Sequence, residues 1–449
     1  MELKVSPWVN SKSYLAEKVS SVSFVENLKE QVLYVFKGIL SDLWISIIET
    51  GDYQKVKEFA ITNGIESDLC SYLSELKKSE LIISDVPNVE TSKQMLPAPV
   101  SKKIKNYVHF EKIQTKIASE RNLISTLYLV LGYDCNLNCK HCCNPKNEKQ
   151  QKINYDSAKK IIDEAASLGV SEICLTGGEA TINKDFLKIA EYVRHKHLKL
   201  HVFTNCQKLH DDDVFFDKLV SLYPSVVQIS LYSMNSQIHD SITKVQGSCQ
   251  KVIEVIKKLR NKNIDVLVTC FQMSYNSGED DEVKKFAKSV GAQFLSACSF
   301  INNIDNDNIC AKLSEDDIKN FYIKNINKKN IRDKFIKCDE PICSAGLDKI
   351  CVTPNFDVTP CIYMDYKLGN LQTSSLVNIK QNILPDFRKK FIISNLTECF
   401  NYDYCEYCNF CPTYPSNEGN DFMAKSDILC EDAKIYKEVL NLKKFYKIR

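Results

Sequence analysis

Four cysteines fall within nine positions of the stretch LGYDCNLNCKHCCN, residues 131–144. Cys135, Cys139 and Cys142 have the spacing C-x3-C-x2-C and directly follow an apolar run. Three thiolates on one short loop can bind a single four-iron cluster, which then keeps one iron open for another ligand. Structural zinc usually takes four residues from paired C-x2-C knuckles, which this loop lacks. The spacing therefore favours an iron–sulfur cluster, and we assign no role to the extra Cys143.

A second group of cysteines lies in the tail, where nine of the 20 cysteines of the chain fall between Cys338 and Cys430. The stretch CFNYDYCEYCNFCP, residues 399–412, contains a C-x2-C-x2-C run, and a distant cysteine follows it. This spacing is typical of ferredoxin-like clusters. Structural zinc on C-x2-C knuckles is the alternative, because zinc and iron–sulfur ligand spacings overlap.

The elements that must position the first cysteine loop follow from the pattern of residues 121–300. Apolar strand patterns such as EICLTGG and KLHVFTN alternate with helical patterns such as NYDSAKKIIDEAASLG. Six such units indicate buried parallel strands with crossover helices, in a doubly wound sheet or a barrel. Six units fall short of an eightfold barrel, so we predict an α/β fold with a partial (β/α)6 barrel. The cysteine loop then lies at the carboxyl end of a strand, where such folds build their sites.

Composition limits the classes of protein that the chain can belong to. It has 449 residues, of which 44% are hydrophobic and 26% charged, as in an ordinary globular protein. A net charge of +2 gives no argument for nucleic acid as a partner. No signal peptide is visible, and the apolar runs are too short to span a bilayer. We therefore expect a cytoplasmic protein without a membrane partner, in which clustered thiols bind metal.

Other cysteines and histidines have a simpler interpretation. Cys174 and Cys270 lie in apolar strand patterns, where a free cysteine behaves as a small hydrophobic residue. The histidines of RHKHLKLH, residues 194–201, alternate with charges near a predicted helix end. We expect them on a solvated face, with a metal site as the less favoured alternative.

The loop C-x3-C-x2-C after the first strand of a partial barrel resembles the radical S-adenosylmethionine (radical SAM) superfamily. In that family a [4Fe-4S] cluster binds SAM at its open iron, and reductive cleavage yields a 5′-deoxyadenosyl radical. LTGGEA at 175–180 is similar to the family motif for the methionyl amine, and FTNC at 203–206 is similar to a Thr-Asn-Gly turn with Cys206 in place of glycine. The resemblance implies SAM contacts at His141, Gly177, Gly178, Glu179, Thr204, Asn205, Ser230 and Gln272.

The tail resembles the SPASM extension of radical SAM enzymes, which carries auxiliary iron–sulfur clusters. The match includes the stretch LDKICVTPNFDVTPC, a predicted β-hairpin with its turn at Pro354-Asn355. It departs at Phe356, where the family has a turn glycine, and in the compressed C-x2-C-x2-C run. The resemblance implies one or two auxiliary clusters. We expect one on Cys405, Cys408, Cys411 and Cys430, and a second on Cys343 and Cys361 with Cys338, Cys351 or Cys399 as a third ligand.

The front of the chain, residues 1–85, has the order of a winged-helix domain. A strand at 21–28 and an amphipathic helix at 31–51 precede two more helices and a short apolar strand. This pattern resembles the recognition domains of ribosomal-peptide modification systems, which bind a leader peptide by strand addition. The complete division is a recognition domain (1–85), a linker (86–120), the barrel (121–300), a helical bridge (301–335) and the SPASM-type extension (336–449).

The order of these parts is similar to that of radical SAM peptide maturases, including sactipeptide and ranthipeptide synthases. The resemblance implies an enzyme that modifies a precursor peptide with a leader, most simply by forming a cysteine thioether crosslink, and that takes electrons from a flavodoxin or ferredoxin. Alternatives are a carbon–carbon crosslink, epimerisation or side-chain oxidation as in sulfatase maturation, although sulfatase-maturating relatives lack the front domain. A non-enzymatic iron–sulfur or zinc protein is a further alternative. No general base is identifiable.

Overall fold

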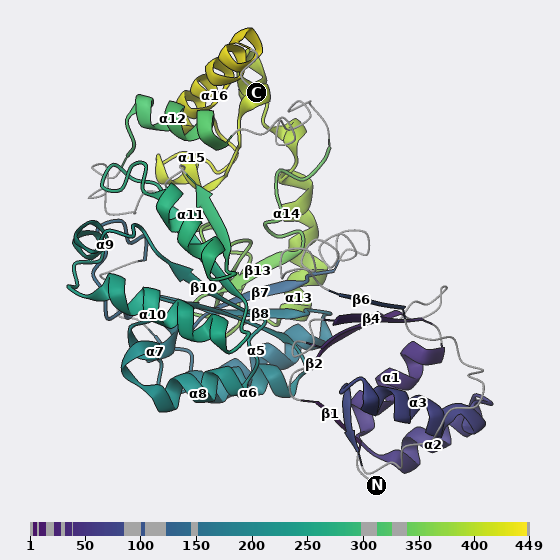
Figure 1. Ribbon diagram of the computed structural model, residues 1–449. Coiled ribbons are helices and arrows are strands. Elements are labelled where there is room, and N and C mark those ends of the chain that lie inside the picture. Colours follow the sequence, from purple (N-terminus) through teal and green to yellow (C-terminus); the bar gives the residue numbers. More distant parts are fainter. Residues whose placement is uncertain are drawn as a thin grey trace.

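The structure is a computed structural model, shown in Figure 1, and its central feature is one large sheet. It describes residues 3–6, 9–14, 22–27, 32–37, 39–84, 100–103, 123–144, 151–297, 312–325 and 339–446. Within these residues the large sheet has nine strands in the order β12-β11-β10-β9-β8-β7-β13-β14-β15. The first six are the predicted parallel strands: β7 Thr126–Val130, β8 Glu172–Thr176, β9 Lys199–Thr204, β10 Val226–Ser230, β11 Val266–Phe271 and β12 Gln293–Ala297.

Helices cover the outer face of this sheet and confirm the predicted alternation. They are α5 Tyr155–Ser167, α6 Phe186–His195, α7 Gln207–Asp211, α8 Asp213–Ser221, α9 Ser236–Thr243, α10 Ser248–Asn261 and α11 Asp280–Ser289. Every second strand residue, such as Leu127, Ile173 and Val202, is buried in the core shared with these helices. The alternate residues line the concave side, because successive side chains of a strand point to opposite faces. The result is a partial (β/α)6 barrel.

The predicted hairpin of the tail joins the barrel sheet directly. β13 Lys349–Val352 pairs in parallel with β7, and β14 Asp357–Thr359 and β15 Gly369–Asn370 extend the sheet in antiparallel order. The turn between β13 and β14 contains Phe356 with φ of 64°. This left-handed conformation explains why a glycine is expected there, since any other residue adopts it at some cost.

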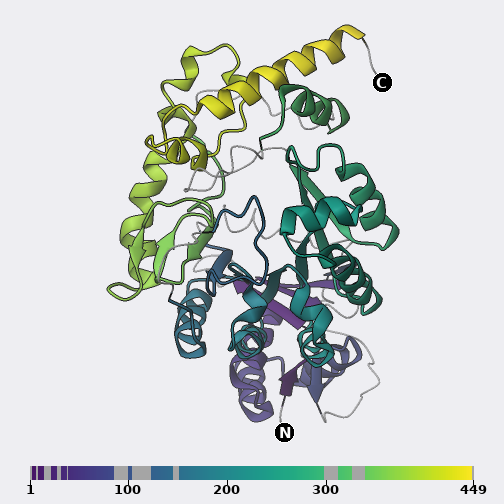
Figure 2. The same ribbon diagram turned by 90° about the vertical axis from the view of Figure 1, so that its left-hand side faces the viewer.

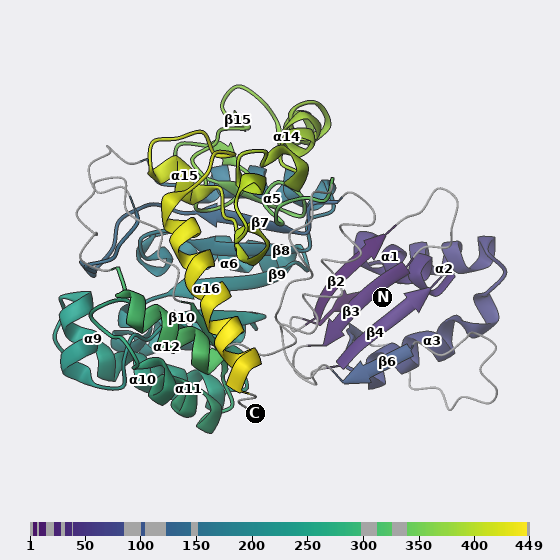
Figure 3. The ribbon, with the colours of Figure 1, turned by 90° about the horizontal axis from the view of Figure 1, so that it is seen from above.

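The rest of the tail lies over the barrel in helices. These are α13 Leu376–Asn378, a π-helical turn Ile379–Ile383, α14 Leu384–Lys390, α15 Thr413–Asn417 and α16 Asp427–Tyr446. Figures 2 and 3 show α16 crossing above the barrel, next to α12 Glu315–Asn325. The Tyr322 hydroxyl donates to Asp432 at 2.6 Å across this pair. α12 is the described part of the expected bridge, while residues 298–311 and 326–338 lie outside the described residues.

The front of the chain differs from the expected winged helix in its sheet. The predicted strand at 21–28 is confirmed as β3 Val22–Asn27, but the predicted helix at 31–51 is wrong in its first third. Residues Val32–Lys37 form strand β4, and α1 covers Ile39–Thr50. Cross-strand pairing outweighs helical periodicity in VLYVFK, because β-branched and aromatic side chains fit a pleated sheet. The remaining elements are β1 Leu3–Val5, β2 Val9–Tyr14, α2 Tyr53–Thr62, α3 Glu66–Lys78 and β5 Ile82–Ser84.

Two small sheets organise this front part around its own core, in which Trp44 and Phe36 are fully buried. β1 pairs with β5, so a strand does follow the three helices as expected. The other sheet has the order β2-β3-β4-β6, and β6 Val100–Lys103 comes from the expected linker. The expected linker therefore contributes a strand to the front sheet, while residues 85–99 and 104–122 lie outside the described residues.

The front sheet contacts the barrel through its β2 edge. The Ser11 amide donates to the His197 carbonyl at 3.0 Å, and the Arg194 guanidinium donates to the Val9 carbonyl at 3.2 Å. Arg194 lies in the last turn of α6 and His197 lies between α6 and β9, at the amino end of the parallel strands. Among the described residues, no helix combines the length and the apolar character that crossing a membrane requires.

Candidate functional site

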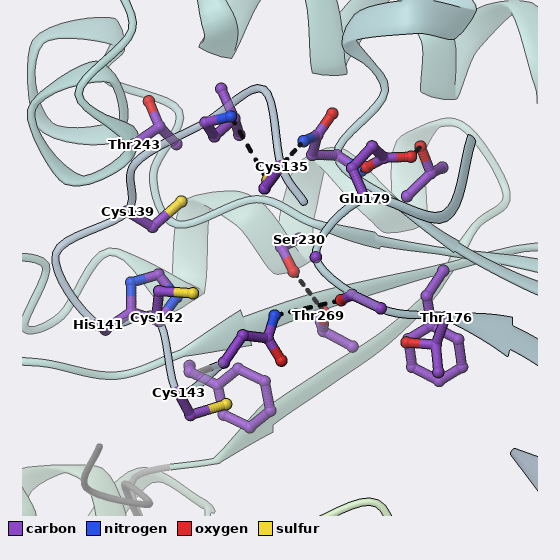
Figure 4. Close-up of a pocket in the computed structure, with 18 of the residues that line it drawn as sticks. Cys135, Cys139, His141, Cys142, Cys143, Thr176, Glu179, Ser230, Thr243 and Thr269 are labelled. Carbon is purple, nitrogen blue, oxygen red and sulfur yellow. Dashed lines mark hydrogen bonds between the residues drawn. The ribbon is translucent and has the colours of Figure 1, made fainter. Parts of the chain in front are cut away.

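A cavity of about 290 Å³ opens at the carboxyl ends of the barrel strands. Its wall is formed by the cysteine loop after β7, the turns after β8 and β9, the inner face of β10 and β11, and Tyr363 from the tail. Figure 4 shows Cys135, Cys139 and Cys142 on one loop around this cavity, with Glu179 and Ser230 on other parts of the wall. The cavity therefore brings together the three cysteines and all but one of the predicted SAM contacts.

The cysteine loop suits the cluster that its spacing predicts. The Leu137 amide points at the Cys135 sulfur at 3.4 Å, and the Asn205 side-chain amide approaches the same sulfur at 3.6 Å. Such donors stabilise thiolate and cluster sulfur and tune the cluster potential. Burial nevertheless raises the pKa of Cys135. A bound metal would reverse this shift, since coordination deprotonates a thiol.

Gly177 and Gly178 allow the turn after β8 to pack against the base of the cysteine loop. The Gly178 amide donates to the Gly132 carbonyl at 2.9 Å, and the next amide donates to the Asp134 carbonyl at 2.8 Å. A Cβ atom on either glycine would overlap backbone atoms of residues 132–134. The glycines are therefore required for close approach of two protein segments, in addition to any approach of a ligand.

Glu179 is buried in the cavity wall, and its carboxylate joins two turns. It accepts hydrogen bonds from Thr181, through the amide and the hydroxyl, from the Thr204 hydroxyl at 2.8 Å, and from the Asn205 amide at 2.6 Å. Burial raises the pKa of Glu179, and the hydrogen bonds oppose this shift. Thus Glu179 holds the turn after β8 to the turn after β9, while its position in the wall leaves it next to any bound ligand.

The turn after β9 contains Thr204, Asn205 and Cys206. Cys206 has φ of 70°, the left-handed region where related turns have glycine. Its side chain is fully buried in the barrel core, so packing offsets the backbone cost of about 1–2 kcal/mol. The Asn205 side chain also donates to Asn136 at 2.7 Å. This turn therefore reaches across to the cysteine loop.

Ser230 and Gln272 have different positions relative to the cavity. Ser230, the last residue of β10, lines it and lies 3.5 Å from the Thr269 hydroxyl. Gln272 is not among the residues that line the cavity. Its side chain accepts from the Gly278 amide at 3.0 Å and contacts the Cys270 sulfur at 3.5 Å. Gln272 is therefore the one predicted SAM contact that does not line the cavity, and its side chain holds the loop after β11.

Several lining residues were missed by sequence reasoning. Tyr232 lies two positions after Ser230, Thr243 ends α9, and Tyr363 follows Cys361 in the tail. Cys143, to which we assigned no role, also lines the cavity. The proximity of Tyr232 to Ser230 and of Tyr363 to Cys361 in the sequence was a usable signal. No spacing rule connects Thr243 to the site.

Several tail thiols lie close enough together to raise one another's pKa. Burial raises the pKa of Cys408, and the nearby charges of Cys399, Cys430 and Cys405 raise it further. Burial also raises the pKa of Cys361, where Cys411 is the thiol that adds to the shift. Cys399 therefore lies near Cys408, and Cys411 lies near Cys361, while the ligand set Cys405, Cys408, Cys411 and Cys430 stays a prediction. The Ala345 amide points at the Cys343 sulfur at 3.5 Å, and Cys338 lies outside the described residues.

A second polar cluster lies inside the barrel on β8 and β9. The Cys174 sulfur and Glu172 each lie 3.4 Å from His201 Nδ1, and all three residues are buried. His201 therefore points into the barrel, and the expectation of a solvated face is wrong for it. Alternation along β9 places it inward, next to Phe203. Sulfur, nitrogen and oxygen ligands together suit zinc, but the mutual contacts of these groups already account for their burial.

Comparison with known proteins connects this geometry to a family. Residues 129–290 match the family model described as "Radical SAM superfamily". Two similar proteins from Bacillus subtilis are "Antilisterial bacteriocin subtilosin biosynthesis protein AlbA" and "Sporulation killing factor maturation protein SkfB", each 26% identical over 56% of this chain. "Mycofactocin maturase MftC" from Mycolicibacterium smegmatis is 27% identical over 38% of the chain. The matched stretches span 58%, 63% and 44% of these three relatives.

Solved structures show the same fold over most of the chain. Streptococcus suis SuiB, solved with its precursor peptide SuiA, covers 95% of this chain and 99% of its own, with a TM-score of 0.56 at 14% identity. The protein anSMEcpe, solved with AdoMet and a peptide, covers 71% of this chain and 99% of its own, with a TM-score of 0.51 at 16% identity. The chain therefore shares the fold of these two structures, and the SuiB match extends over both flanking parts.

Proposed function

We propose that this chain, which carries a radical SAM domain, is an enzyme that modifies a ribosomally made precursor peptide. The family uses a [4Fe-4S] cluster and SAM, and the cluster and SAM together supply a 5′-deoxyadenosyl radical that removes a hydrogen atom from the substrate. The observation that carries the proposal is the cavity itself. Its wall includes Cys135, Cys139 and Cys142 together with the turns after β8 and β9, at the carboxyl ends of the strands.

A peptide is the substrate class that the flanking parts support. The front sheet has an antiparallel edge, which is the kind of surface to which an extended peptide adds as a strand. The names of similar proteins refer to bacteriocin biosynthesis and maturation. We propose that residues 1–103 bind the leader of the precursor and that its core segment enters the cavity. This division would explain why the front part contacts the barrel away from the cysteine loop.

For the bond that forms, we propose a thioether between a cysteine of the peptide and the carbon that loses hydrogen. The carbon loses one hydrogen atom to the radical, the thiol loses its proton, and one electron leaves. Two groups of tail thiols provide ligands for auxiliary clusters that accept this electron, and Tyr363 links one group to the cavity wall. A flavodoxin or ferredoxin would supply the reducing electrons.

The test is co-expression with candidate precursor peptides, followed by mass spectrometry of the peptide. Thioether formation predicts a loss of two hydrogens, about 2 Da, and one thiol that iodoacetamide no longer alkylates. A carbon–carbon crosslink would give the same mass with every thiol still reactive, and epimerisation would leave the mass unchanged. A C135A/C139A/C142A variant is the matched control. If the wild type cleaves SAM but modifies no peptide, the peptide assignment is wrong.

The leader-binding role has its own test. Deletion of residues 1–103, which removes the whole front sheet with β6, should abolish modification of the full precursor. SAM cleavage in the absence of peptide should persist, because the cavity and its cysteines lie outside this segment. Equal turnover of the precursor by the shortened chain would contradict a recognition role.

A further inference from the structure

Tyr232 lies beside the cysteine loop and contacts its histidine. The Tyr232 hydroxyl and His141 Nε2 are 2.9 Å apart, and the two rings meet edge to face with centroids 4.6 Å apart. His141 occupies the loop position between Cys139 and Cys142. A single contact therefore connects the end of β10 to the segment that carries two of the three cluster ligands.

Tyr232 is itself held from three sides, so the place of its hydroxyl is defined. Its amide donates to His239 Nδ1 at 3.2 Å, and its ring stacks on the His239 ring at 5.4 Å. Its carbonyl accepts a hydrogen bond from the Asn276 side chain at 2.8 Å. His239 belongs to α9, and Asn276 lies in the loop before α11. Tyr232 is thus held by α9 and by the loop before α11.

The same helix α9 also holds the backbone of the cysteine loop. The Lys140 amide donates to the Ile242 carbonyl at 2.9 Å, and the Asn138 amide donates to the Thr243 carbonyl at 3.2 Å. These bonds use carbonyls at the carboxyl end of α9, which have no partner within the helix. The loop is therefore attached twice, through its backbone to α9 and through the His141 side chain to Tyr232.

His141 Nε2 and the Tyr232 hydroxyl form a hydrogen bond whose direction depends on the imidazole tautomer. An imidazole nitrogen without a proton accepts this bond from the phenol, and one with a proton donates it. Exchange of the tyrosine for phenylalanine would remove this bond and keep the ring volume.

We propose that Tyr232 is a positioning residue of the SAM site, whose hydroxyl fixes His141 and so sets the shape of the cysteine loop where SAM binds. The inference rests on the proposed radical SAM function and adds a residue that was not among the predicted SAM contacts. It also explains why a tyrosine with a polar hydroxyl is buried, at 6% exposure, next to the cavity. Burial of such a group is costly unless it has a partner.

The experiment is a double-mutant cycle on the full chain with reconstituted clusters. Y232F, H141A and Y232F/H141A are compared with the wild type for SAM affinity, iron content and the electron paramagnetic resonance spectrum with SAM. Y192F is the matched control, because Tyr192 also donates a hydrogen bond, at 2.6 Å to Asp163, but lies on α6 outside the cavity wall. Amide hydrogen exchange of residues 138–142 in the cluster-free chain is the readout that does not need SAM.

We expect Y232F to keep its iron, to bind SAM about fivefold more weakly and to show a changed spectrum. The double variant should bind SAM as H141A does, because Tyr232 acts through His141. Amide hydrogen exchange of residues 138–142 should be faster in Y232F than in the wild type and unchanged in Y192F. Unaltered exchange and SAM affinity in Y232F, or fully additive losses in the double variant, would overturn the inference. If the wild type binds no SAM, the proposed function fails, and the exchange result alone decides the role of Tyr232.

Discussion

The hydroxyl of Thr204 donates a hydrogen bond of 2.8 Å to the carboxylate of Glu179, and this contact joins the turns that follow β8 and β9. The same carboxylate accepts the Asn205 amide at 2.6 Å. Asn205 in turn reaches Asn136 and the Cys135 sulfur in the cysteine loop. Hydrogen bonds that begin at one buried carboxylate therefore hold three segments of the cavity wall together.

The first prediction concerns this acid. E179Q should weaken SAM binding at least tenfold and lower the free energy of unfolding by about 1–3 kcal/mol, because a side-chain NH2 group replaces an acceptor that faces backbone and hydroxyl donors. Isothermal titration with SAM and urea unfolding measure the two effects. The control E254Q changes an exposed carboxylate on α10 and should alter neither quantity. If E179Q bound SAM with wild-type affinity, the carboxylate would not be needed to hold these hydrogen-bond donors in place.

The second prediction separates the two ways of grouping the tail thiols. If Cys408 belongs with Cys399, Cys405 and Cys430, the double variant C405A/C408A should lose one cluster, about four irons per chain, and C408A/C411A should lose two. Iron and acid-labile sulfide after anaerobic reconstitution measure this. Equal iron losses in the two double variants would instead support the ligand set Cys405, Cys408, Cys411 and Cys430. Zinc in place of iron would exclude both arrangements.

The third prediction concerns access to the front sheet. One edge strand of this sheet, β2, contacts the barrel, and the other edge strand, β6, pairs with β4 from Val32 to Val35. Strand addition next to β4 would therefore require β6 to leave. S101P, which removes an amide from β6, should tighten binding of the precursor leader several-fold, measured by fluorescence anisotropy. S101A keeps the amide and is the matched control. Weaker binding to S101P would mean that β6 forms part of the peptide site.

The fourth prediction is a pH dependence of stability. Burial lowers the pKa of His239 to about 4, against about 6.5 in the unfolded chain. Between these values the unfolded state binds more protons, so stability rises with pH across the window and is lost as the pH falls. At pH 5.5 this loss is roughly 1.4 kcal/mol. H239Q should flatten the dependence of unfolding on pH, whereas H195Q, at an exposed site, should not. If the free energy of unfolding varied with pH equally in H239Q and the wild type, His239 would not be the source of this dependence.

Much of the barrel could be predicted because its signals are local. Alternating strands and helices, the C-x3-C-x2-C loop and the Gly-Gly-Glu turn each lie within a short stretch of chain, and the structure contains all three. The helix predicted at 31–51 failed because VLYVFK has both helical spacing and strand-forming residues. Pairing with β3 and β6, which are distant in sequence, decided between them.

The three cysteines, the glycine turn and the β/α order could be read from the sequence, since they depend on residue type and near-neighbour spacing. Tertiary packing was needed to show that Gln272 holds a loop and that Tyr232 contacts His141. It also decided that the tail hairpin continues the barrel sheet through β7. These are contacts between residues far apart along the chain, and they depend on how whole elements pack, which no local pattern encodes.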